Sequence, residues 1–156
     1  MDEYMPTITP EQLLAVVDDF VKTASTRYSA LEGVVALLAA NFKNYSWTGI
    51  YILDGDRLKL GPYRGSPSPH ETIPIDQGIC GAAIREKKTI IVPDVTADPR
   101  YLACSVSTRS EIVVPIFDSN GEAIAEIDID SDNPDDFGES DRILLESIAG
   151  KLSQLF

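Results

Sequence analysis

The chain contains two cysteines, and both lie where the sequence pattern predicts a break between regular elements. Cys80 stands beside glycine in Gly78-Ile79-Cys80-Gly81, at a predicted helix start, and Cys104 lies in a predicted polar loop. Thiols at helix N-termini or in accessible loops become reactive thiolates, whereas buried structural cysteines are inert. Both positions therefore favour thiol chemistry. The alternative is that Cys80 is a small buried residue and Cys104 a loop residue with no role.

A predicted β-hairpin between about residues 111 and 130 supplies a second set of reactive side chains. If Asn120-Gly121 forms a two-residue turn, Glu111 lies opposite Asp130, whereas a four-residue turn places Glu111 opposite Asp128. Both registers keep these carboxylates on one face. A three-residue turn would reverse the face on which Glu111 lies.

The returning strand of this hairpin alternates between isoleucine and acid. Ile127 and Ile129 point to one side, while Glu126, Asp128 and Asp130 point to the other, with about 7 Å between successive side chains on a face. Like charges crowded on a sheet are destabilising, so this acidic face predicts a bound cation or a retained proton. The alternative is a solvated outer face on which the charges deter aggregation.

A metal ion is not the expected cation. Residues 128–139 superficially resemble a calcium loop, but Asn133 replaces the glycine of the turn, Pro134 and Asp135 occupy its middle, and a strand precedes it. One histidine and two separated cysteines also lack zinc-ligand spacing. We therefore expect no metal site.

Composition limits the class of protein. The 156 residues are 44% hydrophobic, which suits one domain with a single core. A net charge of −12 disfavours nucleic acid and anionic membranes as partners. The acidic start and an apolar run no longer than residues 34–40 predict a cytoplasmic chain without a membrane span. Thiols there are normally reduced, so a disulfide would be transient.

The elements that must position these side chains follow from periodicity and turn signals. The expected helices cover about residues 10–25, 29–41, 78–86 and 139–155, and the expected strands cover 47–53, 57–60, 72–75, 89–92, 111–117 and 122–130. This order predicts an α+β domain with helices against an antiparallel sheet. Two long loops, at 61–71 and 93–109, are expected to converge over one sheet face and form a small-molecule pocket.

Several of these segments together resemble the GAF-domain free methionine-(R)-sulfoxide reductases. The resemblance extends from about Trp47 to the end and rests on Trp47-Thr48-Gly49-Ile50-Tyr51, Leu60-Gly61-Pro62-Tyr63-Arg64-Gly65, Ile73-Pro74, Gly78-Ile79-Cys80-Gly81, Pro93-Asp94-Val95, Ala103-Cys104, Ser110-Glu111-Ile112-Val113-Val114-Pro115 and Asp128-Ile129-Asp130-Ser131. It implies one GAF domain over residues 1–156, with about six antiparallel strands flanked by N-terminal helices and a C-terminal helix. It also implies a homodimer without a prosthetic group, recycled by thioredoxin and ultimately by NADPH.

The resemblance assigns roles to individual residues. Cys104 matches the nucleophile that attacks the sulfoxide of the free amino acid, and Cys80 matches a cysteine able to resolve the resulting sulfenic acid. A helix N-terminus is expected to stabilise the Cys80 thiolate. The matched pocket residues are two aromatic walls, Trp47 and Tyr51, and three acids, Glu111, Asp128 and Asp130. One acid is expected to protonate the departing oxygen and another to hold the substrate ammonium.

The chain also departs from that family. Glu126 is an additional acid where relatives are usually apolar, and the third cysteine that relatives commonly carry before Ile73 is absent, with Pro69 or His70 nearest its place. These departures leave two interpretations. One is a reductase that uses Cys80 for resolution, and the other is a non-catalytic GAF sensor of a small metabolite or of redox state. His70 is either an exposed loop residue or a titratable neighbour of the thiols.

Overall fold

A computed structural model describes residues 8–102 and 107–156. Its six strands form one antiparallel sheet in the order β3-β2-β1-β6-β5-β4. The strands are β1 (Trp47–Asp54), β2 (Arg57–Arg64), β3 (Thr72–Pro74), β4 (Ile90–Val92), β5 (Ser110–Phe117) and β6 (Ala123–Ser131). Strand β6 lies between β1 and β5, which are its two antiparallel partners.

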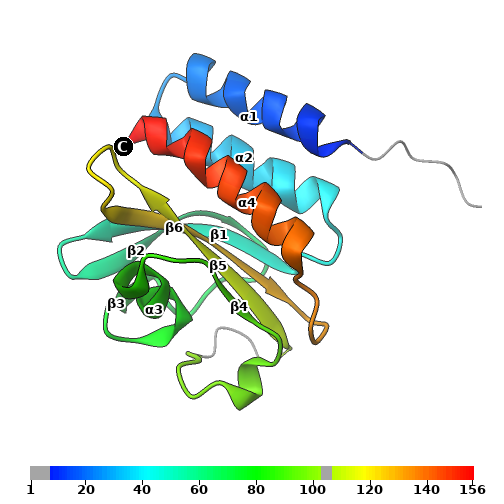
Figure 1. Ribbon diagram of the computed structural model, residues 1–156, viewed down its shortest axis with the longest axis vertical. Helices are drawn as coiled ribbons and strands as arrows, with labels where there is room; N and C mark the ends of the chain where they lie inside the picture. Colours follow the sequence, from blue (N-terminus) through cyan, green and yellow to red (C-terminus); the bar gives the residue numbers. More distant parts are fainter. Residues whose placement is uncertain (1–7, 103–106) are drawn as a thin grey trace, which may run out of the picture.

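Helices cover both faces of this sheet (Figure 1). They are α1 (Pro10–Thr23), α2 (Arg27–Asn41), α3 (Gly78–Glu86) and α4 (Glu139–Leu152), with short 3₁₀ turns η1 (Val95–Ala97) and η2 (Ser153–Leu155). Helices α2 and α4 lie on one face with α1 packed outside them, and α3 lies on the other face. The expected α+β architecture, with six antiparallel strands between terminal helices, is confirmed.

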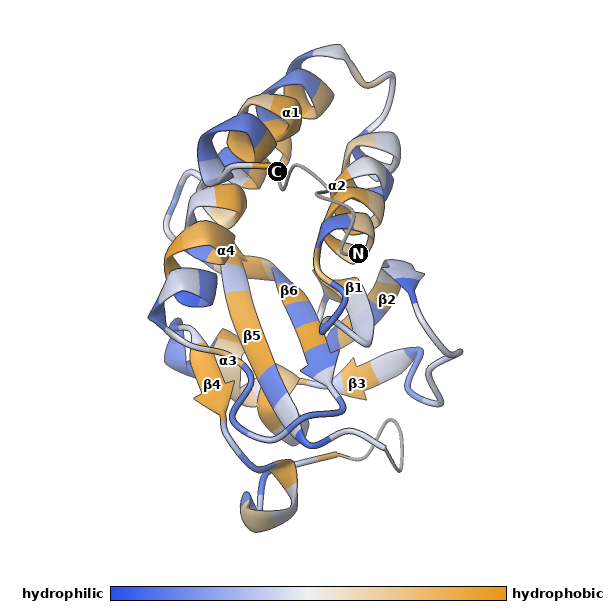
Figure 2. Ribbon diagram, turned by 90° about the vertical axis from the view of Figure 1, so that its right-hand side faces the viewer, coloured by the Kyte–Doolittle hydropathy of each residue, from blue (hydrophilic) through white to orange (hydrophobic). Residues whose placement is uncertain are grey.

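Alternation along β6 divides the interior into two regions, and hydrophilic and hydrophobic bands succeed one another along this strand (Figure 2). Ile127 and Ile129 are buried with residues of α1, α2 and α4 in the larger hydrophobic core. A smaller core lies under α3 and includes Tyr51 and Cys80. None of the described helices is long and apolar enough to cross a membrane.

Local signals account for the helix starts. Thr9 caps α1 through a reciprocal capping box with Gln12, and Pro10 occupies the first turn, where its missing N–H costs no hydrogen bond. Thr26 caps α2 by accepting a hydrogen bond from the Ser29 backbone. These caps fix the layer that covers the isoleucine side of β6.

The expected loop over residues 61–71 begins later than predicted. Strand β2 continues to Arg64, with an irregularity opposite β1 between Gly49 and Tyr51. Glycine and proline in this stretch indicated a loop, but a sheet irregularity accommodates residues that a regular ladder excludes. The extension places Tyr63 on the sheet beside Gly49.

The hairpin has one of the two expected registers but a different turn. Glu111 lies opposite Asp130, as the two-residue turn predicted. The actual turn contains three residues, since the Asp118 N–H donates to the Glu122 carbonyl and Gly121 has a positive φ of 78°. A second irregularity, between Ile116 and Phe117, adds one residue on β6 and restores the side-chain alternation.

Candidate functional site

Three rows of side chains on adjacent strands build the acidic face. Trp47, Asp130 and Glu111 form the first row across β1, β6 and β5, and Asp128 lies in the second row between Gly49 and Val113. The third row contains Tyr51, Glu126 and Pro115. Antiparallel partners share a face, so four carboxyl groups converge under α3.

This face is covered rather than solvated. Glu126 is 0% exposed, and Asp128, Asp130 and Glu111 are between 1% and 4% exposed. The interpretation of a solvated outer face was therefore wrong. Sequence alternation identified the shared face but carried no information on α3, which arrives from elsewhere in the chain and closes it.

Helix α3 brings the first cysteine onto the acids. Cys80 is the third residue of the helix and is 5% exposed, and its Sγ donates a hydrogen bond to Asp128 Oδ2 at 3.3 Å. Gly81 allows the close approach of this helix to the preceding segment, because a Cβ there would lie 2.5 Å from the Ile75 carbonyl oxygen.

The Cys80 thiol is harder to ionise than an ordinary cysteine. Burial raises its pKa, and ionisation of Asp128, Glu126 or Glu111 raises that pKa further. The expectation that a helix N-terminus would stabilise the thiolate was wrong here, because desolvation and three nearby acids outweigh the helix dipole. Cys80 is a protonated thiol in the resting site.

The carboxyl groups also retain protons. Burial raises the pKa of Glu126, Asp128 and Asp130, and hydrogen bonds with Glu111 only partly oppose the shift at Asp128 and Asp130. Ionised carboxylates are acceptors only, so a hydrogen bond between two carboxyl groups requires a proton. The acidic face therefore contains carboxylic acid that can donate a proton.

The Trp47 indole stands at the edge of this face. It stacks on Tyr63 at a centroid distance of 5.8 Å and lies 6.3 Å from the Tyr51 ring. Its Nε1 donates a hydrogen bond to the Ser66 carbonyl at 3.0 Å. A Cβ at Gly49 would lie 2.3 Å from the indole, so this glycine is required for the ring to lie against the strand.

A cavity of about 80 Å³ opens beside the indole. Its lining combines Trp47 and Asp130 with hydroxyl and acidic groups, namely Ser46, Ser66, Ser68, Ser107, Thr108 and Asp132. Tyr51 does not line it: this tyrosine is fully buried, and its hydroxyl donates to the His70 carbonyl at 2.8 Å. A larger hollow of about 390 Å³ lies between β5 and α4 and has none of the four acids in its lining.

The predicted nucleophile, Cys104, lies outside the described residues. The described residues nearest to it in the sequence are Leu102 and Ser107. Ser107 lines the cavity, and the Leu102 side chain lies 3.3 Å from the Cβ position of Gly78, at the start of α3. The described end of the long loop is therefore close to the helix that carries Cys80.

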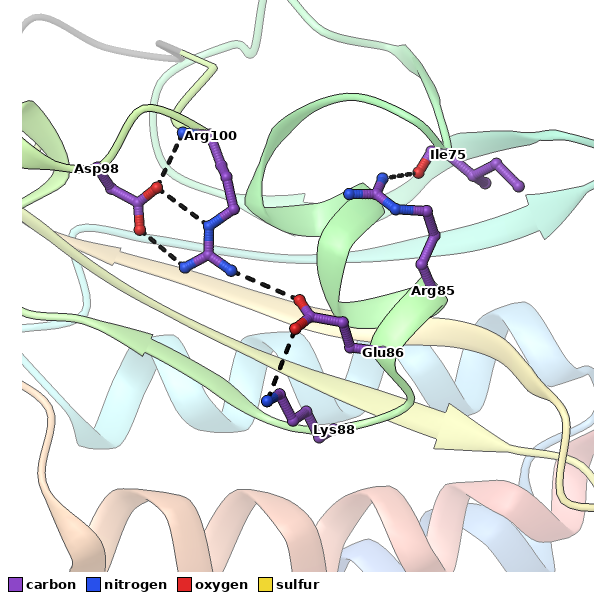
Figure 3. Close-up of polar contacts among 6 residues, drawn as sticks. All are labelled: Ile75, Arg85, Glu86, Lys88, Asp98 and Arg100. Carbon is purple, nitrogen blue, oxygen red and sulfur yellow. Dashed lines mark hydrogen bonds and ion pairs between the residues drawn. The ribbon is translucent and has the colours of Figure 1, made fainter.

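Arg100 ties the same loop to the far end of α3 (Figure 3). Its guanidinium contacts both oxygens of Asp98, at 3.1 Å and 2.8 Å, and reaches Glu86 at 3.5 Å. Glu86 also pairs with Lys88, and Arg85 of the same helix donates to the Ile75 carbonyl. The Arg100 guanidinium lowers the pKa of Asp98 and keeps this pair charged.

One group of potential metal ligands exists among the described residues. Atoms of Cys80, Glu111 and Asp128 all lie within 4.8 Å of one another. The set lacks histidine, and its members are joined by protons, since Cys80 donates to Asp128 and Glu111 shares a hydrogen bond with Asp128. We interpret the group as a proton-holding site.

Sequence reasoning missed part of the cavity. Tyr63, which supports the indole, was placed in a loop, and the serines at positions 66 and 68 carried no signal beyond a polar composition. The Gly-Pro-Tyr-Arg segment would have indicated Tyr63 only if its strand character had been recognised. The acids and Cys80, by contrast, were found from alternation and from local context.

The fold and this site define the chain as a GAF domain, whose family profile matches residues 26–156. GAF domain-containing protein A of Dictyostelium discoideum is 36% identical over 88% of this chain and 86% of its own length. Free methionine-R-sulfoxide reductase of Escherichia coli (strain K12) is 31% identical over 81% of this chain and 76% of its own length.

A solved structure agrees with these relatives. Free methionine-R-sulfoxide reductase of Neisseria meningitidis, in complex with its substrate, has a TM-score of 0.89 and 32% sequence identity, covering 99% of this chain and 93% of its own. The chain belongs to the GAF-domain family of free methionine-R-sulfoxide reductases.

Proposed function

We propose that this chain reduces free L-methionine-(R)-sulfoxide to L-methionine with a cysteine nucleophile. The observation that carries this proposal is the buried face where a thiol and four carboxyl groups meet beside the Trp47 cavity, in a member of this family. Thiol, proton donor and aromatic wall are the groups that sulfoxide reduction requires.

In the first step, the Cys104 thiolate attacks the sulfoxide sulfur. A carboxylic acid of the buried face protonates the oxygen, and the resulting hydroxyl passes from the substrate sulfur to the Cys104 sulfur. The sulfur–oxygen bond of the substrate and the transient sulfur–sulfur bond both break, which leaves Cys104 as sulfenic acid. Methionine leaves with its sulfur reduced by two electrons, and the cysteine is oxidised by two. Burial raises the pKa of Asp128 and of Asp130, which favours the protonated form of each and makes either group a candidate proton donor.

In the second step, Cys80 resolves the sulfenic acid. Its sulfur attacks the Cys104 sulfur, a disulfide forms, and the hydroxyl leaves as water after taking a proton from the acids. Asp128, which accepts the thiol hydrogen bond at 3.3 Å, is placed to take the Cys80 proton. Thioredoxin then reduces the disulfide with electrons that come ultimately from NADPH, and the protein needs no prosthetic group.

Substrate recognition uses charge and shape. The indole of Trp47 would pack against the methyl–sulfur end of the substrate, and Asp130, which shares its cavity, would pair with the ammonium group. Tyr51, which does not line the cavity, would support the position of the indole through the contact between the two rings. A homodimer in the cytoplasm is part of the same proposal, and sedimentation of the purified protein measures its oligomeric state.

The decisive test incubates the protein with dithiothreitol and the separate (R) and (S) epimers of free methionine sulfoxide, and quantifies methionine. We expect turnover of the (R) epimer alone and none in Cys104→Ser. Cys80→Ser should retain activity with dithiothreitol and lose it with thioredoxin, because only the physiological reductant requires the disulfide.

Two outcomes would contradict the proposed reductase activity. One is an unreacted (R) epimer with the native protein, and the other is full activity in Cys104→Ser. Binding of the (R) epimer without turnover would instead identify the non-catalytic sensor, the alternative that the sequence left open.

A further inference from the structure

Glu126 is a buried carboxyl group that the proposed reaction does not use. It is fully buried on β6, between Tyr51 of β1 and Pro115 of β5. Neither of its carboxyl oxygens has a hydrogen-bond partner among the described residues. The Cys80 thiol lies between two acids: its Sγ donates to Asp128 at 3.3 Å, and its contact with Glu126 lowers the Glu126 pKa by less than burial raises it.

An unpartnered carboxyl group in this position is stable only when it carries a proton. Moving an ionised carboxylate out of water without a partner costs far more than moving the neutral acid. The groups that face Glu126 are the Cys80 thiol from α3, Asp128 on its own strand and the Tyr51 ring from β1. None of them is a cation, and burial outweighs the contact with the Cys80 thiol, the one contact that favours the ionised form.

The protonation of Glu126 controls the charge beside Cys80. When Glu126 is neutral, the Cys80 proton can move to Asp128 without bringing a thiolate against a second anion. When Glu126 ionises, its charge opposes the thiolate. Thiol reactions ordinarily accelerate as pH rises, because the thiolate fraction grows. At Cys80, ionisation of Glu126 opposes this increase in the thiolate fraction.

We propose that Glu126 is a positioning residue for Cys80: it acts in its neutral form, and its ionisation sets an alkaline limit on the reactivity of this thiol. The proposal deepens the proposed function, since the limit would fall on the resolving step.

The test measures how fast Cys80 is alkylated by iodoacetamide as a function of pH. All proteins carry Cys104→Ser, which leaves Cys80 as the only thiol. We expect Glu126→Gln to match the parent at low pH and to react progressively faster than it at alkaline pH, by about tenfold for each unit by which the thiol pKa falls. Glu122→Gln, which removes an exposed acid from the same hairpin, should follow the parent profile.

Parallel alkylation profiles for Glu126→Gln and the parent at every pH would overturn the proposal. A substitution that only changed the access of iodoacetamide to Cys80 would shift the alkylation rate by the same factor at every pH.

A second measurement does not depend on the fold of the variant. Infrared spectra of the parent with labelled glutamate should show a neutral carboxyl band at neutral pH that disappears where alkylation lags, and absence of that band at neutral pH would also overturn it.

Neither measurement uses turnover. A protein that fails to reduce methionine sulfoxide but shows the Glu126-dependent alkylation profile would contradict the proposed function alone. A competent reductase without that profile would contradict the inference alone.

Discussion

Trp47 keeps its place because two glycines leave room for it. The ring would lie 2.3 Å from a Cβ at Gly49 and 2.8 Å from one at Gly65, both far closer than van der Waals contact allows. Stacking on Tyr63 and the hydrogen bond to the Ser66 carbonyl hold the indole from the other sides. At the scale of residues, the pocket therefore depends on two glycines without side chains as well as on the groups that contact the ring.

Replacing Gly49 by alanine should move the indole and weaken substrate binding. We expect a rise in KM for the free sulfoxide and a loss of about 1–3 kcal/mol in the free energy of unfolding, the usual cost of overpacking. Trp47 is the only tryptophan, so its fluorescence reports the displacement directly. Gly150→Ala, where a Cβ meets nothing within 4 Å, is the matched control. An unchanged emission spectrum in Gly49→Ala would contradict the role of this glycine.

At the scale of elements, the site is assembled from a sheet face, helix α3 and the long loop after β4. Arg100 connects the last two, through Asp98 on the loop and Glu86 at the end of α3. The contacts are largely exposed, so their contribution to global stability is small. Their effect should fall on the position of the loop, which leads directly into the segment carrying Cys104.

Arg100→Ala should therefore lower the rate of methionine formation while leaving the melting temperature nearly unchanged. The expected stability loss is about 0–1 kcal/mol, because exposed ion pairs are screened by solvent. Single-turnover assays with dithiothreitol isolate the first chemical step from recycling. Lys59→Ala, which removes an ion pair with Asp54 on the β1–β2 hairpin, is the control. Equal rates in the two variants would show that the connection to α3 does not position the loop.

Sequence patterns predicted the elements better than they predicted how the elements cover one another. Alternation placed Glu111 on the same face as Asp128 and Asp130 correctly, because the period of a strand is a local property, whereas the pairing with Asp130 was one of two registers left open. Helix α3 has the predicted bounds, but the state of Cys80 was predicted wrongly, since burial under a helix depends on tertiary packing. Tyr63 was missed for a related reason: glycine and proline signal loops, and only the partner strand shows that they sit in a sheet irregularity.

At the scale of the whole molecule, both faces of the sheet are covered, and one of them buries acids. A carboxyl group whose pKa is raised in the folded state binds its proton more tightly there than in the unfolded chain. Its contribution to stability is complete below the unfolded pKa and is lost as pH rises through the folded pKa. Burial raises the pKa of Glu126, Asp128 and Asp130, so all three act in this direction.

The urea midpoint of the protein should therefore fall as pH rises above the ordinary carboxyl range. The net charge of −12 also destabilises the fold as acids ionise, but salt screens that repulsion and barely affects buried groups. A fall that persists at about 1 M salt and is smaller in Glu126→Gln than in Glu122→Gln would identify the buried acids as its source. A midpoint that rises as pH increases above that range would contradict the assignment of retained protons.

The three-residue turn at the end of the β5–β6 hairpin has an evolutionary consequence. Without the compensating irregularity after Ile116, the pairing of Phe117 with Ala123 would extend along the hairpin and place Glu111 opposite Ile129, on the face covered by α2 and α4. A single-residue insertion or deletion at the tip is thus tolerated only together with a second one in the strand. Relatives whose turns differ by one residue while keeping the acidic face should differ in the bulge as well.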